Sequence, residues 1–329
     1  MEIIGQTNFD FIGRRNLAYL ISAALLAVGL LATVQVWRGR ANLGVDFTGG
    51  TTVQLRFDHP PDVAVVRRVL TAAGIDPELQ TLDRGDRLLV RLRKLEGEKI
   101  EAGGGDPAKA GERKAPERKA DEDTAGSARR LEDALRRGMP RDTFTVEGSN
   151  EVGPAIGREL LVAAQKAILL SLVGIVLFIW WRFEFTFGLA ATIATFHDVL
   201  AVLGVVWLLD REITFLTVSG LLTLAGYSLT DTVVVYDRIR ENLRGRRRGR
   251  FSEVINASIN EVLARTAMTS LTTLLAVLSL LFVGGPVLWD FAFALALGIV
   301  MGTYSSWFVA APIVYEWRTR FAARGKPDK

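Results

Sequence analysis

The sequence predicts an α-helical membrane protein with six transmembrane helices and a small α+β domain outside the cytoplasm. Three observations support this fold class. The apolar residues make up 49% of the 329-residue chain and are bunched into runs rather than spaced periodically. Six runs are long enough to cross a bilayer, because roughly 20 residues span its hydrocarbon core. The long polar stretch between the first two runs has the pattern of a soluble domain.

The first predicted span covers residues 17–37 and follows a short polar segment, residues 1–16. It lacks a small-residue cleavage pattern followed by a mature soluble protein, so we expect a retained helix rather than a removed signal peptide. The other five predicted spans are residues 162–181, 187–209, 213–236, 266–282 and 288–315.

Basic residues near the span ends predict the orientation in the membrane. Residues 244–250 read Arg-Gly-Arg-Arg-Arg-Gly-Arg, within a loop predicted at 237–265. The tail, residues 316–329, carries further cations: Arg318, Arg320, Arg324 and Lys326. Short cytoplasmic loops are enriched in Lys and Arg, so this loop and both termini are predicted to lie in the cytoplasm. Residues 38–161 then lie on the opposite side of the membrane.

The segment 38–161 contains the elements of a compact domain. Alternating strand patterns, helical spacing and turn residues predict the order β-α-β-β-α-β, at residues 52–57, 61–73, 79–82, 87–93, 127–137 and 144–147. This order is that of a ferredoxin-like domain. Residues 96–126 are rich in Glu, Lys, Ala, Gly and Pro with almost no large apolar side chain, which predicts a flexible insertion. A binding role for its mixed charges is the alternative.

The composition excludes several classes of site. The chain has no cysteine, which excludes disulfides, thiolate metal sites and cysteine nucleophiles. Its 40 basic and 36 acidic residues nearly balance, which disfavours a nucleic-acid-binding surface. We therefore interpret the basic clusters as signals of membrane orientation.

Asp231 lies inside the fourth predicted span, residues 213–236. A carboxylate there costs about 2.5–3.5 kcal/mol on insertion scales, so such residues usually face a protein interior or a water path and serve transport or proton relay. The alternative is that Asp231 lies close enough to the helix end to reach the interface, since charged residues begin at Asp237. Tyr227 and Thr230 lie beside Asp231 and are predicted to support it.

Arg265 begins the fifth predicted span from the side on which the fourth ends, so we expect it within reach of Asp231. An Asp–Arg pair in a low dielectric holds the aspartate ionised, and a change in partner distance or hydration lets it take a proton. A static ion pair that locks two helices is the alternative. Thr269 and Thr272 follow at helical spacing from Arg265. Their hydroxyls either hydrate a proton path or pack against a neighbouring helix.

A second polar pair, His197 and Asp198, lies in the third predicted span. A histidine can titrate at physiological pH, whereas a packed, hydrogen-bonded histidine is the structural alternative. Asp198 is the more costly member of the pair, so it is the second candidate for a proton-relay residue after Asp231.

Several separated motifs resemble the SecF family, membrane subunits of the bacterial Sec export machinery. They occur in one order over nearly the whole chain: Gly44-Val-Asp-Phe-Thr-Gly-Gly-Thr51, Glu151-Val-Gly-Pro154, His197-Asp198, Gly226-Tyr-Ser-Leu-Thr-Asp231 running to Asn242, and Arg265-Thr266 with Thr269-Ser270.

The resemblance implies membership of the resistance–nodulation–division superfamily and a place in the bacterial inner membrane. It implies a SecD-like partner that supplies a similar six-span half, a position beside the SecYEG channel, and use of the proton-motive force to move unfolded preproteins across the membrane and release them outside. Asp231 and Arg265 fall where the family places proton-relay residues, and His197 and Asp198 match a further motif. We expect no metal and no cofactor other than the coupling proton, and membrane lipids but no nucleic acid as partners.

Other functions remain open. One is a proton-driven exporter of lipids or small molecules from the same superfamily. A second is an intramembrane aspartyl protease using Asp198 and Asp231, although neither aspartate lies in a Gly-x-Gly-Asp sequence and Arg265 would compete for the charge. A third is a structural scaffold, for which the substitution Asp231→Asn would be silent. We expect a non-enzymatic, proton-driven subunit.

Overall fold

A computed structural model describes residues 7–82, 85–93, 117–140, 143–152, 154–245 and 250–322. The chain forms two compact units. One consists of Met1–Leu43 and Ala163–Lys329, and contains most of the long apolar helices. The other, Gly44–Val162, contains the β-sheet.

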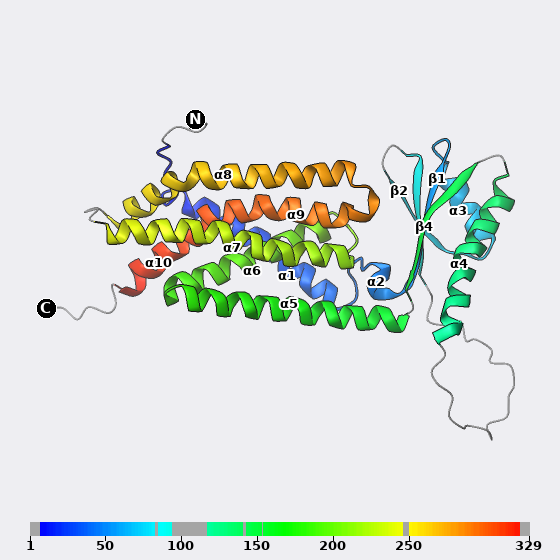
Figure 1. The fold of residues 1–329 in the computed structure, drawn as a ribbon, viewed down its shortest axis with the longest axis horizontal. Coiled ribbons are helices and arrows are strands. Elements are labelled where there is room, and N and C mark those ends of the chain that lie inside the picture. Colours follow the sequence, from blue (N-terminus) through cyan, green and yellow to red (C-terminus); the bar gives the residue numbers. More distant parts are fainter. Residues whose placement is uncertain are drawn as a thin grey trace, which may run out of the picture. The chain divides into compact units, whose positions relative to one another are not determined.

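The first unit is a bundle of long helices (Figure 1). These are α1 Arg15–Trp37, α5 Pro154–Arg182, α6 Phe185–Leu208, α7 Phe215–Arg244, α8 Phe251–Val283, and α9 Pro286–Ser305 continued by η1 Ser306–Ala310 and α10 Ala311–Ala322. In the described parts of the chain, six helical segments are long and apolar enough to cross a membrane. The apolar stretches of α6 and α7 are each 56% buried, against 17% for α8. Thus α6 and α7 lie inside the bundle, while most of α8 faces outward.

The helices on either side of the predicted loop 237–265 are longer than expected. The fourth span was expected to end at residue 236, but α7 continues to Arg244, and α8 begins at Phe251 rather than near residue 266. Charged residues in these extensions alternate with buried Ile239, Ile255 and Ile259 at helical spacing, so one apolar face continues beyond the apolar run. Residues 246–249 of the basic loop lie outside the described residues.

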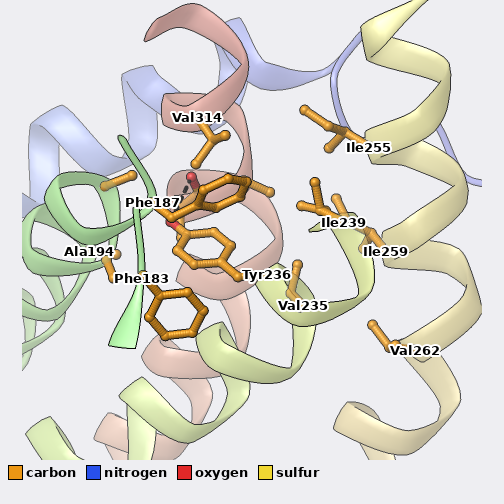
Figure 2. Close-up of a cluster of buried hydrophobic side chains, with 14 of the residues drawn as sticks. Phe183, Phe187, Ala194, Val235, Tyr236, Ile239, Ile255, Ile259, Val262 and Val314 are labelled. Atoms are coloured by element: carbon orange, nitrogen blue, oxygen red, sulfur yellow. Dashed lines mark hydrogen bonds between the residues drawn. The ribbon is translucent and has the colours of Figure 1, made fainter. Parts of the chain in front are cut away.

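A cluster of apolar side chains joins these extensions to α6 and α10 (Figure 2). Tyr236 lies at its centre and is fully buried, with edge-on ring contacts to Phe183 and Phe187. Its hydroxyl donates to the carbonyl of Ala310, 3.2 Å away, so the buried phenol is hydrogen-bonded.

The last span contains a π-helical turn, η1, between α9 and α10. Pro312 accounts for the wide turn, because it has no N–H to donate to the carbonyl of Phe308 four residues earlier. The hydrogen bond from Tyr236 to Ala310 satisfies one carbonyl of this turn.

The N-terminal segment is held by two asparagines one turn apart on α8. Asn260 accepts a hydrogen bond from the N–H of Phe9 and donates one to its carbonyl, both at 2.9 Å. Asn256 donates to the exposed carboxylate of Asp10 at 2.7 Å. The N–H of Gly13 also donates to Asp10, and these two hydrogen bonds, the backbone one first, hold the pKa of Asp10 below its usual value of 3.8.

The second unit is a four-stranded antiparallel sheet covered on one face by two helices (Figure 1). Its elements follow the order expected from the sequence: β1 Gly50–Phe57, α3 Val63–Ala72, β2 Pro77–Leu82, β3 Arg87–Arg93, α4 Glu117–Gly138 and β4 Phe144–Val152. The strands lie in the order β2-β3-β1-β4. Leu55 and Val90 of the sheet pack against Leu70 of α3 and Leu131 of α4 in one apolar core.

Helix α4 begins at Glu117, ten residues before the predicted start at residue 127. The end of the predicted insertion, residues 117–126, is therefore helical, which fits its content of Glu, Lys, Arg and Ala, all good helix formers. Residues 96–116 lie outside the described residues.

Candidate functional site

Asp198 of α6 is fully buried and holds three helices together. Its Oδ2 accepts hydrogen bonds from Ser228 of α7 and from Ser305 at the end of α9, the latter at 2.7 Å. Its Oδ1 lies 2.9 Å from Nδ1 of the neighbouring His197. Every described partner of this carboxylate is polar, so the cost of burying it is offset by hydrogen bonds from α6, α7 and α9.

His197 is also buried, and only one of its ring nitrogens is used. The second, Nε2, has no hydrogen-bond partner among the described residues. The ring lies near that of Tyr304, with centroids 6.5 Å apart. The histidine therefore acts in this structure as a hydrogen-bonded neighbour of Asp198.

Asp231 of α7 has fewer partners. Its Oδ2 accepts a hydrogen bond of 2.9 Å from Ser270 of α8, and Ser270 in turn accepts one of 2.8 Å from Thr303 of α9. The side chain is 5% exposed, so the carboxyl group is almost fully removed from solvent. The fourth span thus buries its acid where α7, α8 and α9 meet.

The two carboxylates are connected through short segments of α7 and α9. Ser228, which binds Asp198, lies three residues before Asp231 on α7. Thr303, which binds the serine beside Asp231, lies two residues before Ser305 on α9. One turn of α7 therefore carries Asp231 and a hydrogen-bond donor to Asp198. One turn of α9 carries a second donor to Asp198 and the hydroxyl that binds the partner of Asp231.

Close packing of α9 on α7 brings these groups together. Gly298 and Gly302 are four residues apart on α9, and a Cβ at Gly302 would lie 2.9 Å from the Cβ of Ser228. A Cβ at Gly298 would lie 2.7 Å from a methyl group of Leu224. The absence of side chains at these positions lets the helix backbones approach, as is common between membrane helices.

Arg265 is not a neighbour of Asp231 in this chain. It is exposed on α8, and no ion pair within 4.0 Å joins it to a described carboxylate. The reason is its position in the helix, because Arg265 precedes Ser270 by five residues, which places it about 140° around the axis. With Ser270 facing Asp231, the guanidinium points away from the acid.

The hydroxyls expected to support Asp231 bind elsewhere. Thr230 donates to the carbonyl of Gly226, and Thr269 and Thr272 donate to carbonyls of their own helix. The hydroxyl of Tyr227 is buried without a hydrogen-bond partner in the described structure. Thr269 and Thr272 instead share the exposed face of α8 with Arg265.

Four hydroxyls without a predicted role surround the two acids: three donate to a carboxylate, and the fourth, that of Thr303, donates to Ser270. Ser228 and Ser270 were part of recognised motifs without a role, and Thr303 and Ser305 were not singled out. A local signal existed for the last two, since residues 303–306 read Thr-Tyr-Ser-Ser within an otherwise apolar span. Polar residues grouped at the middle of a span mark a polar contact inside the bundle.

A Gly-Gly turn, Gly49-Gly50, lies near the start of the soluble unit. A short helix, α2 Val45–Thr48, ends at Gly49, whose φ of 75° is in the left-handed region. Gly50 has φ of 147°, and a Cβ there would lie 2.5 Å from the carbonyl oxygen of Leu92. The turn therefore requires glycine at both positions.

Comparisons with known proteins show the family to which the chain belongs. A family model described as "Protein export membrane protein SecD/SecF, C-terminal" matches residues 133–320, and a model of the SecD/SecF GG motif matches residues 41–61. The SecF protein translocase subunit of Thermodesulfovibrio yellowstonii is 44% identical over 317 residues, covering 95% of this chain and 96% of the relative. The SecF subunit of Desulfurispirillum indicum is 38% identical over 318 residues, covering 94% and 92%.

A solved structure is similar over nearly the whole chain. The crystal structure of SecDF from Thermus thermophilus, described as a translocon-associated membrane protein, matches with a TM-score of 0.75 and 38% sequence identity. The match covers 95% of this chain and 39% of SecDF, so the chain spans well under half of that longer protein. With the family model and the full-length relatives, this match shows that the chain is a multi-pass membrane protein of the SecF family of protein export subunits.

Proposed function

We propose that the chain is the SecF-type half of a proton-driven protein export complex. With a SecD-like subunit it uses the proton-motive force to promote the translocation of unfolded preproteins through a SecYEG-type channel and their release on the outer side. Asp231 carries the coupling proton, and the complex lies in the bacterial inner membrane with both termini of this chain in the cytoplasm.

The observation that carries the proposal is Asp231 itself. A carboxyl group buried in a membrane helix with a single hydroxyl partner is only partly compensated as an anion. The ratio of its charged to its neutral form therefore depends strongly on small changes in hydration or in nearby charge. A shift between two helix arrangements that bind the proton differently can convert a proton gradient into motion.

The outward face of α8 supports a SecD-like partner. Arg265, Thr269 and Thr272 form one exposed stripe on a helix long and apolar enough to cross a membrane. An arginine facing lipid is costly, so we infer that a second membrane subunit covers this stripe and supplies an anionic or hydrogen-bonding group to Arg265. In the Thermus thermophilus relative, the SecD and SecF names are joined in one protein of which this chain matches 39%.

The soluble unit acts on the outer side in this proposal. Its β-α-β-β-α-β order and antiparallel strand order support a ferredoxin-like domain. The basic sequences at 244–250 and 316–329 support a cytoplasmic location for the opposite ends of the helices.

We expect the chain to have no catalytic activity of its own. Asp198 and Asp231 share no hydrogen bond and contact different serines, whereas a protease dyad needs two carboxyl groups that share a proton.

The test is gradient-dependent preprotein export in membrane vesicles, comparing the wild type with Asp231→Asn co-expressed with its SecD-like subunit at matched levels. Asparagine keeps the size and accepts from Ser270 but does not titrate. We expect stimulation by the proton gradient to be lost while the complex still assembles. Thr223→Val, which removes a hydroxyl of α7 that donates to a carbonyl of its own helix, is a control for nonspecific damage to the helix bundle. Export by Asp231→Asn that responds to the gradient as in the wild type would refute the proposed role of Asp231.

A further inference from the structure

Ser270 differs from most hydroxyl residues of the fourth and fifth spans and shares with Ser228 a hydrogen bond to a carboxylate on another helix. Thr223, Thr230, Thr269 and Thr272 each donate to a carbonyl of their own helix, the usual arrangement for such residues in membrane helices. Ser270 instead donates to a side chain on another helix, the carboxylate of Asp231. Its hydroxyl oxygen remains available as an acceptor, and Thr303 occupies that position.

Thr303 has two acceptors within hydrogen-bond distance. Its Oγ1 lies 2.8 Å from the hydroxyl oxygen of Ser270 and 2.7 Å from the carbonyl oxygen of Ile299 on its own helix. A hydroxyl has one hydrogen, so Thr303 donates to only one of these at a time. The choice between them is made by rotation about the C–O bond and requires no movement of heavy atoms.

These alternatives fit the two states of a carboxyl group. When Asp231 is ionised, Ser270 donates to it and Thr303 donates to Ser270, so both hydroxyls point toward the negative charge. When Asp231 is protonated, its own O–H can donate to Ser270, the Ser270 hydrogen turns to Thr303, and Thr303 donates to Ile299. Every donor then still has an acceptor, and the only bond that forms or breaks is the O–H bond of the carboxyl group.

We propose that Ser270 and Thr303 are positioning residues for the proton on Asp231, forming a reversible hydroxyl chain that satisfies the carboxyl group in both its charged and its neutral state. The inference rests on the proposed role of Asp231 as the carrier of the coupling proton. Under this inference, residues of α8 and α9 help to hold the proton on Asp231, which itself lies on α7.

No charged group competes with this chain in the described residues. On α8, Arg265 faces away from Asp231, and on α6, Asp198 and His197 are bonded to each other, with Asp198 also accepting from Ser228 and Ser305. On α9, the group facing Asp231 through Ser270 is the hydroxyl of Thr303. The hydroxyl chain is therefore the local determinant of how the acid holds its proton.

The experiment is a pH titration of the protonated-carboxyl band by infrared spectroscopy, on the full chain with its SecD-like subunit in lipid. Asp231→Asn identifies the band. Thr303→Val keeps the shape of the side chain but removes the hydroxyl, and we expect it to shift the titration midpoint by about 0.5–1 pH unit, the effect of one hydrogen bond. Thr303→Ser, which keeps the hydroxyl, should retain the wild-type midpoint, as should the control Thr223→Val, whose hydroxyl bonds to its own helix.

The pH profile of gradient-driven export should move with the infrared midpoint in Thr303→Val. A midpoint unchanged in Thr303→Val, an equal shift in Thr303→Ser, or the absence of a titrating band removed by Asp231→Asn would each overturn the hydroxyl chain. The infrared titration observes Asp231 directly and needs no export activity. A normal response to the gradient in Asp231→Asn would therefore refute the proposed function without deciding the hydroxyl chain, which the midpoints decide separately.

Discussion

The two buried aspartates of the bundle differ in how completely their surroundings satisfy them. Asp198 is fully buried and contacts His197, Ser228 and Ser305, from its own helix and two others. Asp231 is nearly as buried but contacts one hydroxyl, that of Ser270. The two acids are therefore similar in burial and differ in the number of groups that bind the carboxylate.

This contrast assigns different tasks to the two residues. A carboxylate held by several donors from three helices stabilises one arrangement of those helices, and changing its protonation would disrupt several bonds together. A carboxylate with one flexible partner can change protonation at a lower cost to the packing. The proposed function accordingly gives the coupling proton to Asp231, while the hydrogen bonds of Asp198 join α6, α7 and α9.

The largest effect is expected from Asp198→Ala. Removing this carboxylate leaves His197, Ser228 and Ser305 without their shared partner in a buried site, which should lower the free energy of unfolding by about 3–5 kcal/mol. Asp231→Ala should cost only about 1 kcal/mol, because the hydroxyl of Ser270 can turn to a carbonyl of its own helix. Denaturant-driven unfolding in lipid bicelles measures both. Similar losses in the two variants would contradict the contrast between the two acids.

An intermediate effect is expected from Gly302→Ala. The added methyl would lie 2.9 Å from the Cβ of Ser228, an atom fixed to the helix backbone, and overpacking of this kind costs about 1–3 kcal/mol. Gly174→Ala on α5 is the control, since a Cβ at this position would meet no atom within 4 Å. The same unfolding measurement should rank Gly302→Ala as the less stable variant. The reverse order would show that the contact at Asp198 tolerates separation of α7 from α9.

The smallest effect is expected at Asp10, an exposed carboxylate that has hydrogen bonds but almost no burial. Its pKa is lowered in the folded chain, so it stabilises the docked N-terminal segment above the usual value of 3.8, and this contribution is lost as the pH falls through the lowered pKa. Hydrogen exchange at Gly13 should be slow and unaffected near neutral pH and should accelerate, after correction for intrinsic rates, only in acid. Asp10→Asn should remove most of that pH dependence. A transition near neutral pH would require another titrating group.

The sequence predicts the positions of the spans well because long apolar runs and a polar interruption are local signals. The burial of Asp198 and Asp231 was also predictable, because a carboxylate inside a membrane-spanning run usually faces the protein interior rather than lipid. The partners of these acids were not predictable, because they depend on how each helix is rotated against its neighbours. The expected proximity of Arg265 and Asp231 shows this. An offset of five residues from Ser270 turns the arginine to the outer face of α8.

The helical extensions show a second limit of hydropathy. Residues 237–244 and 251–265 read as a charged loop, yet their buried isoleucines continue the helices. Likewise, the composition of residues 117–126 suggested disorder, while the same Glu, Lys and Ala residues favour helix once an adjoining helix has formed. In both cases the average polarity of the segment wrongly indicated a loop. The spacing of the isoleucines in the first case, and the helix propensity of the residues in the second, indicated the helix that is observed.

The wide turn at Ser306–Ala310 sets the rotational register of the last span. A π-turn contains one residue more than an α-turn, so the residues after it are rotated by about 100° relative to an unbroken helix. This offset allows Ser305 to face Asp198 while Val314 faces the cluster around Tyr236. Deleting one residue from the turn and replacing Pro312 would allow a regular helix but could keep only one of these two contacts. Insertions and deletions in this span are therefore constrained by two contacts, that of Ser305 with Asp198 and that of Val314 with the cluster around Tyr236. The hydropathy of the span does not reveal this constraint.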